Sequence, residues 1–254
     1  MCRKRRAQIT IFVVIGLLIL LIIGLVIIQT QNIRRLKMEN EQLKSMQQMA
    51  IFRPANVIFQ ECTKQLAYNS LKVLGEGGLI YPENFTLSDF AVFALFYYDG
   101  IDLKPSISRI ENELETYVNE NIEGCVYQLY GARYNLSLPE NYTIKTRISD
   151  EKISYEVSYP AKIYLSDATS RLQDFSIEIP YNFYNIYNTV ETIVDATAAE
   201  PTFVDATMLL DKDLNITVSF PKINEIVYQI TDPTFFIEGE PYSYYFAVKV
   251  QNEV

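Results

Sequence analysis

Two short stretches of the chain combine residue types that could do chemistry. Asp211-Lys-Asp213-Leu-Asn215 begins like a calcium-binding loop. Such a loop needs Gly at its sixth position and Glu at its twelfth, where this chain has Ile216 and Lys222. Gly75-Glu-Gly77-Gly78 follows a predicted helix, whereas a phosphate-binding loop joins a strand to a helix. We therefore interpret the first stretch as an acidic turn and the second as the end of a helix.

The residue composition excludes several classes of catalytic and metal-binding site. The chain contains no His, which excludes a Ser-His-Asp triad, a Cys-His dyad and zinc or haem bound through His. The acidic residues Glu111, Glu113 and Glu115 are expected on a solvated helix face, and no motif points to a Ser-Lys catalytic pair. The sequence thus predicts a protein that is not an enzyme, without catalytic, cofactor-binding or metal-binding residues and without a cofactor.

Two of the three cysteines are predicted to form a disulfide. Amphipathic helices are expected over about residues 55–74 and 109–123, the second opened by a capping box at Ser108 and Glu111. Cys62 lies on the apolar face of the first helix, and Cys125 follows the apolar stripe of the second. A bridge would close a loop of about 64 residues, which is worth about 4 kcal/mol in the chain-entropy model. Two unpaired buried thiols are the alternative.

The most apolar segment, residues 9–28, contains only apolar residues and Gly apart from Thr10. About 20 residues at about 1.5 Å each match the roughly 30 Å hydrocarbon core of a bilayer. We therefore predict a transmembrane helix, with the lipid bilayer as its partner. The cations Arg3 to Arg6 place a basic stub, residues 1–8, in the cytoplasm. The expected localisation is the cell membrane, with a single pass and an extracytoplasmic C-terminal domain.

Residues 29–53 contain no Gly and are rich in good helix formers, which predicts a helical stalk that ends at Pro54. Apolar and polar residues alternate along its 3-4 pattern. Two interpretations stay open: a solvated stalk, and weak parallel self-association through this N-terminal helix.

Charge is distributed unevenly along the chain. The net charge is −9, but residues 1–50 carry eight Lys/Arg and two Asp/Glu and are therefore +6, which leaves −15 for residues 51–254. An acidic surface argues against a nucleic-acid partner, because nucleic acids bind to basic surfaces. Residues 54–254 are long enough for one sizeable core or two small ones, so a subdivision near residue 131 stays open.

Periodicity predicts the fold class of this part. Alternating residues indicate antiparallel strands at Ile144–Ile148, Ile153–Tyr159 and Leu172–Ile179. A helix over about 182–198 and a short helical turn near 203–210 follow, and then three strands at Ile216–Phe220, Ile226–Ile230 and Tyr242–Val250. The order of helices, strands, helix and strands predicts an α+β fold with an antiparallel sheet.

Four Asn-x-Ser/Thr motifs predict glycosylation of an outward-facing domain. The acceptor residues are Asn84, Asn135, Asn141 and Asn215. The chain also holds 19 Tyr and 14 Phe, more than a core of this size requires. Some of them, such as Tyr97, Tyr98, Tyr242 and Tyr244, could stack at a surface, although core filling accounts for most of them.

The stretch Arg6-Ala7-Gln8-Ile9 before the apolar segment resembles the class III signal of archaeal type IV pilin-like proteins. The resemblance implies cleavage between Ala7 and Gln8 by a prepilin peptidase. The chain departs from the pattern at Phe12, where many pilins have the Glu that pairs with a neighbouring N-terminus during assembly. An uncleaved anchor therefore stays open as the alternative, and so does the absence of filaments.

A second resemblance covers more of the chain. Gln8 to Phe12, Cys62, the stretch Leu71 to Gly78 and the acidic helix before Cys125 are similar to single-span surface proteins of DPANN-type archaea. Ile230-Thr-Asp232 and Gly239-Glu-Pro-Tyr242 continue the likeness. This group has no assigned activity, so the resemblance implies a context and not a mechanism.

Together these features predict a membrane-anchored cell-surface glycoprotein with a structural or adhesive role, for example a minor pilin-like subunit. The alternative is an anchored extracytoplasmic binding or accessory domain that recognises a peptide, a glycan or a secretion partner. A concave site with convergent polar groups would favour the alternative.

Overall fold

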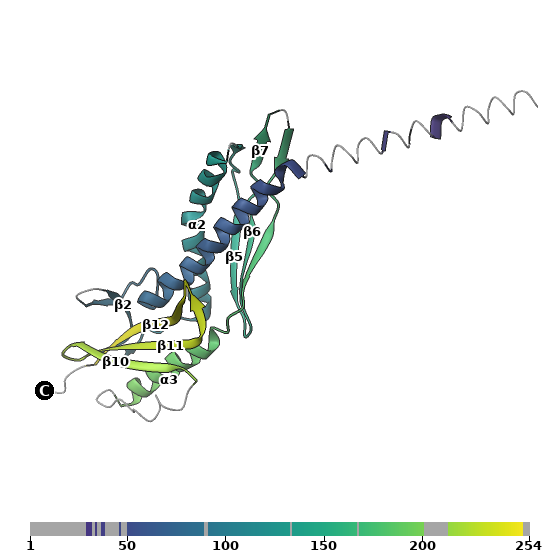
Figure 1. The fold of residues 1–254 in the computed structure, drawn as a ribbon. Coiled ribbons are helices and arrows are strands. Elements are labelled where there is room, and N and C mark those ends of the chain that lie inside the picture. Colours follow the sequence, from purple (N-terminus) through teal and green to yellow (C-terminus); the bar gives the residue numbers. More distant parts are fainter. Residues whose placement is uncertain are drawn as a thin grey trace, which may run out of the picture. The chain divides into compact units, whose positions relative to one another are not determined.

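The computed structural model describes residues 51–88, 91–132, 134–166, 168–200 and 213–250, and a few residues between 29 and 50. The chain divides into two units, Met1–Arg53 and Pro54–Val254, and each is considered by itself. Of the first unit, the described residues are helical. The second unit contains all the strands given below (Figure 1).

The predicted fold class is wrong in its transmembrane part. In the portion of the chain that the structure describes, no helix is long and apolar enough to cross a membrane. The helices described from residue 51 onward are amphipathic, with charged residues such as Lys64 and Glu120 on their exposed sides. The predicted span 9–28, the stub 1–8 and the cleavage point Ala7–Gln8 lie outside the described residues. So do most of the stalk and the turn predicted near 203–210.

Residues 51–77 form a continuous helix, called the first helix here. Its buried face repeats at three- and four-residue intervals, through Phe59, Thr63, Ala67, Leu71 and Leu74. This helix is longer than the predicted 55–74, because it continues through Gly75 and Gly77.

The first helix ends at Gly78, and two of its glycines let it approach strand β12 (Glu240–Lys249). Gly78 has φ +79°, and its N–H donates to the carbonyl of Leu74 at 2.8 Å. A Cβ atom on Gly75 would lie 2.4 Å from the carbonyl oxygen of Ser243. The Gly-rich stretch therefore does end a helix, as predicted, and it also makes room for the backbone of β12.

Helix α2 (Ile107–Gly131) is the second long helix. Ser106, not the predicted Ser108, is its N-cap, and the Ser106 side chain accepts the N–H of Arg109 at 3.3 Å. The helix runs past Gly124, since its buried stripe continues at Val126 and Leu129.

Six strands form what we call the ribbon, a three-stranded antiparallel structure beside the first helix (Figure 1). They are β4 (Asn135–Ser137), β5 (Thr143–Ile148), β6 (Ile153–Ser158), β7 (Lys162–Leu165), β8 (Ala168–Arg171) and β9 (Phe175–Ile179). Sheet β5-β6-β9 is followed by sheet β4-β7-β8, and the N–H of Leu172 donates to Ala161 across the junction. The ring of Phe59 packs there, with centroids 5.2 Å from Tyr159 and 5.9 Å from Phe175.

The remaining strands form what we call the curled sheet, in the order β1-β2-β12-β11-β10 with β3 paired to β2. They are β1 (Phe85–Leu87), β2 (Val92–Tyr98), β3 (Ile101–Asp102), β10 (Asn215–Lys222), β11 (Glu225–Ile237) and β12. Contrary to the prediction of an antiparallel sheet, β2 and β12 are parallel. The domain is otherwise α+β, as predicted.

Each face of the curled sheet has its own core. One face packs on helix α3 (Tyr184–Ala199), where the rings of Phe183 and Tyr244 are 5.6 Å apart and Phe96 stacks on Phe246 at 5.0 Å. The opposite face carries a smaller buried cluster of Leu95, Val227 and Ala247. The curl brings the β1 end of the sheet over this second cluster, where Thr86 of β1 contacts Glu225 of β11.

Candidate functional site

The structure joins the two predicted cysteines in a disulfide. Cys62 of the first helix and Cys125 of α2 are bonded, with their Cα atoms 5.5 Å apart. Cys125 is buried in the interface between the two helices. The bridge therefore ties the middle of the first helix to the last two turns of α2, and the predicted pairing is confirmed.

The four predicted glycosylation acceptors are all at exposed positions. Asn84 precedes β1, Asn135 and Asn215 begin strands β4 and β10, and Asn141 lies in the turn before β5. The structure does not gather them into one site. Each of them is accessible to a modifying enzyme, and glycosylation itself stays a prediction.

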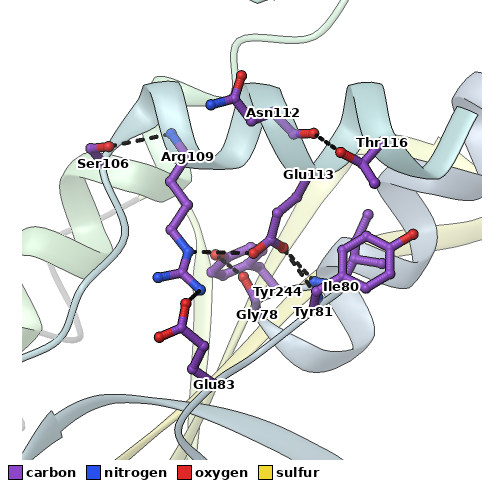
Figure 2. Close-up of polar contacts among 10 residues, drawn as sticks. All are labelled: Gly78, Ile80, Tyr81, Glu83, Ser106, Arg109, Asn112, Glu113, Thr116 and Tyr244. Carbon is purple, nitrogen blue, oxygen red and sulfur yellow. Dashed lines mark hydrogen bonds and ion pairs between the residues drawn. The ribbon is translucent and has the colours of Figure 1, made fainter. Parts of the chain in front are cut away.

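The most elaborate polar cluster surrounds Glu113 of α2 (Figure 2). Glu113 is only 7% exposed, and its carboxylate accepts the backbone N–H of Ile80 at 2.7 Å and that of Tyr81 at 3.3 Å. Arg109, one turn earlier, lies 3.4 Å from the same carboxylate and 3.3 Å from Glu83. Glu113 thus holds the segment that leaves the first helix, and its oxygens are occupied by structural partners.

The neighbouring carboxylates of Glu111 and Glu115 bond to strand β5. Glu111 accepts the backbone N–H of Ile148 at 2.8 Å, and Glu115 accepts that of Thr146 at 3.3 Å. Both donors belong to β5, the outer strand of the β5-β6-β9 sheet. The carboxylate row, as we call Glu111, Glu113 and Glu115, was predicted on a solvated helix face, and that prediction is wrong, because each of the three accepts a backbone N–H. Glu111 and Glu115 cover the edge of β5, which would otherwise expose unpaired donors.

A second buried carboxylate, Glu225, lies under strand β1. It accepts the hydroxyl of Thr86, and the ammonium groups of Lys249 and Lys222 lie 2.9 Å and 3.4 Å from it. Burial by itself would raise the pKa of Glu225. The hydrogen bonds from Thr86 and Lys249 and the charges of both lysines outweigh burial, so the pKa is lowered from its usual value.

Several tyrosines proposed as surface stacking positions are instead buried. Tyr242 donates its hydroxyl to the carbonyl of Leu71 at 3.1 Å, and Tyr244 donates to that of Gly78 at 2.6 Å. Both hydroxyls satisfy carbonyls near the C-terminal end of the first helix. Burial raises the pKa of both tyrosines well above the usual value. Tyr97 is also buried, and only Tyr98 is substantially exposed.

Three hollows among the described residues are candidate binding sites. One, about 540 Å³, lies over β5, β6 and the start of β9, and its lining includes Lys145, Glu156 and Asp174. Another, about 590 Å³, lies between α3 and β11 and is lined by polar residues: Asn185, Asn188, Thr189, Asp213, Asp232 and Thr234, with Leu214. Asp232 is buried there and accepts both the N–H and the hydroxyl of Thr234. Among the described residues no group of three His, Cys, Asp or Glu could hold a metal ion.

The third hollow, about 320 Å³, is a groove between the first helix and the end of β11 with the turn that follows it. It is lined by Glu61, Lys64, Gln65 and Tyr68 of the helix, by Phe236 and Ile237 of β11 and by Glu238 of the turn. We call this hollow the groove. Sequence reasoning missed it, and the only signal was that the four helix residues share one face by their spacing of three and four.

No protein-family model, curated protein or solved structure matches the chain. The buried carboxylates and tyrosines are occupied in holding backbone segments, whereas the groove presents both an aromatic surface and polar groups to solvent.

Proposed function

We propose that residues 54–254 form an extracytoplasmic domain of a cell-surface protein with a structural or adhesive role and no catalytic one. The observation that carries the proposal is the Cys62–Cys125 disulfide. Disulfides persist in oxidising compartments and are rare where glutathione keeps thiols reduced. The bridge joins two helices in the interior of the domain, so it is part of the folded structure.

The other polar groups fit a structural role. The carboxylate row bonds to backbone N–H groups of two separate segments. Each such bond fixes the carboxylate against the segment that donates to it. A role as a minor pilin-like subunit would add cleavage between Ala7 and Gln8, which mass spectrometry of the native N-terminus detects.

The disulfide gives the test. Peptide mapping without reductant should show the Cys62 and Cys125 peptides linked, and a membrane-impermeant amine reagent should label the protein on intact cells. Cys125→Ser should destabilise the domain by about 4 kcal/mol, because the unfolded chain loses its constraint. Cys2→Ser is the matched control and should leave both the link and the melting temperature unchanged. Free thiols at both positions in freshly isolated protein would contradict the proposal.

The second candidate function is a binding or accessory domain that recognises a peptide, a glycan or a secretion partner. The groove favours it, since Phe236 is 53% exposed and stands beside Tyr68 and several polar side chains. Exposed aromatic residues surrounded by polar ones are typical of contact surfaces.

A further inference from the structure

The exposure of Phe236 has a specific structural cause. In the pairing of β11 with β12, Asp232 lies opposite Tyr242 and Phe236 lies opposite Pro241, so residues 233–235 are extra in β11. Asp232 stabilises this bulge by accepting the N–H of Thr234 at 2.8 Å. Bulges re-aim side chains, often beside functional sites. Here Phe236 is left exposed at the groove.

The bulge gives Phe235 and Phe236 different surroundings. Phe235 stacks on the buried Tyr181, with ring centroids 4.1 Å apart and planes at 15°. Phe236 makes no ring contact of this kind among the described residues. Phe235 is therefore half-buried against Tyr181, while Phe236 is exposed at the surface.

The other wall of the groove is regular. Glu61, Lys64, Gln65 and Tyr68 occupy positions i, i+3, i+4 and i+7 along one face of the first helix. The opposite side ends in a tight turn in which Glu238 and Gly239 have φ +53° and +87°, as two-residue hairpin turns require. Both walls belong to regular elements, so the groove is preformed.

The charges at the groove are paired with one another. Lys64 lies 3.9 Å from Glu61, and Glu238 lies 2.5 Å from Lys72, the next lysine of the same helix. A groove with compensated charges has no excess to attract an anion or a cation. It offers hydrogen-bond donors and acceptors around two aromatic rings, which suits a neutral ligand with both apolar and hydroxyl-bearing faces.

We propose that this groove binds a neutral saccharide. The inference rests on the proposed surface function and names a ligand class for its binding candidate. The apolar C–H face of a sugar ring would lie against Phe236 and Tyr68. The carboxylate of Glu61 would accept hydrogen bonds from neighbouring hydroxyls, and the amide of Gln65 would both donate and accept them. At about 320 Å³ the groove is at the small end of ligand sites, which fits one or two sugar rings better than an extended peptide.

The test uses the full-length protein and four neutral hexasaccharides: maltohexaose, cellohexaose, chitohexaose and mannohexaose. Saturation-transfer NMR should detect binding of at least one of them, and calorimetric titration should give its affinity. Phe236→Ala should weaken that affinity about tenfold or more, since aromatic anchors dominate small contact surfaces. Gln65→Ala should weaken it less. Because both side chains are exposed, neither variant should lower the melting temperature appreciably.

Phe220→Ala is the matched control, because Phe220 is 68% exposed on β10 outside the groove. It should leave saccharide binding unchanged. The proposal is overturned if none of the four hexasaccharides binds, or if binding survives both Phe236→Ala and Gln65→Ala. Binding of a neutral Gly-Ser-Thr nonapeptide in the groove in place of the sugars would also overturn it. Surface labelling and disulfide mapping are independent of these results, so the surface function can fail or stand separately.

Discussion

The carboxylate row on α2 and the single carboxylate of Glu225 perform similar tasks with different partners. Glu113 holds the segment after the first helix through backbone N–H groups of Ile80 and Tyr81. Glu225 holds strand β1, a few residues later in the chain, through the Thr86 hydroxyl and two lysines. The connection between the first helix and β2 is thus fixed at two points by two buried acids.

The difference between these partners determines what happens when an acid is removed. Backbone N–H groups cannot turn away, so without Glu113 those of Ile80 and Tyr81 lose their acceptor and their desolvation is uncompensated. The Lys222 and Lys249 side chains are 52% and 40% exposed, so without Glu225 their ammonium groups can return to water. Equal burial of two acids therefore does not imply equal importance.

The largest expected effect follows from removing Glu113. Glu113→Ala should lower the free energy of unfolding by about 3 kcal/mol, because it leaves two partly buried backbone donors without an acceptor and removes one of the two carboxylates paired with Arg109. Urea unfolding measures the loss, and hydrogen exchange should show faster exchange at Ile80 and Tyr81. Glu123→Ala, at an exposed position of α2, is the control and should change little. A loss of stability for Glu113→Ala as small as that of the control would show that Glu113 is no stronger an anchor than Glu225.

A smaller effect is expected at the second acid. Glu225→Ala should lower the free energy of unfolding by about 1–2 kcal/mol, since the lost hydrogen bonds are partly replaced by hydration of the lysines. The same urea experiment applies, with Glu240→Ala on the exposed turn of β12 as control. If this variant proved less stable than Glu113→Ala, side-chain partners would be the stronger anchors.

The smallest expected effect is a pH dependence of stability that comes from the charge of Glu225. The pKa of Glu225 is lowered in the folded protein from 4.5, so folding favours its ionised form. Its contribution is complete above about pH 4.5 and is lost as the pH falls through the lowered folded pKa. Wild-type protein should therefore lose more stability between pH 7 and about pH 3 than Glu225→Gln does. Parallel losses in the two proteins would show that Glu225 is not the titrating group.

Much of the fold could be predicted from local pattern. Alternation located β5 and β6, because one face of each strand is buried and the other is not. It also located most of β10 to β12, although β10 is largely exposed and the first four residues of β11 are all buried. Helical spacing located α3 and the buried faces of the two helices that carry the disulfide. These elements owe their structure to residues close by in the chain.

The rest depends on contacts distant in sequence. Strands β1 and β3 contain only three and two residues, and β2 is an unbroken apolar run, so no alternation marked any of them. The parallel pairing of β2 with β12 joins residues about 150 positions apart, and nothing in either strand indicates the other. For the same reason the carboxylate row looked solvated, because its partners at Ile80 and in β5 are backbone groups that no sequence pattern reveals.

The disulfide also decides how the domain would carry a mechanical load. A pull applied at the start of the first helix and at the C-terminal strands passes from Cys62 directly to Cys125 through the covalent bond. The chain between them, which contains β1 to β3 and most of α2, bears none of the extension. At about 3.3–3.6 Å per residue, the bond keeps about 200 Å of chain between the two cysteines from being extended. Under tension the protein would yield in its ribbon or in its C-terminal strands, while the segment tied by Glu113 and Glu225 stayed folded inside its loop.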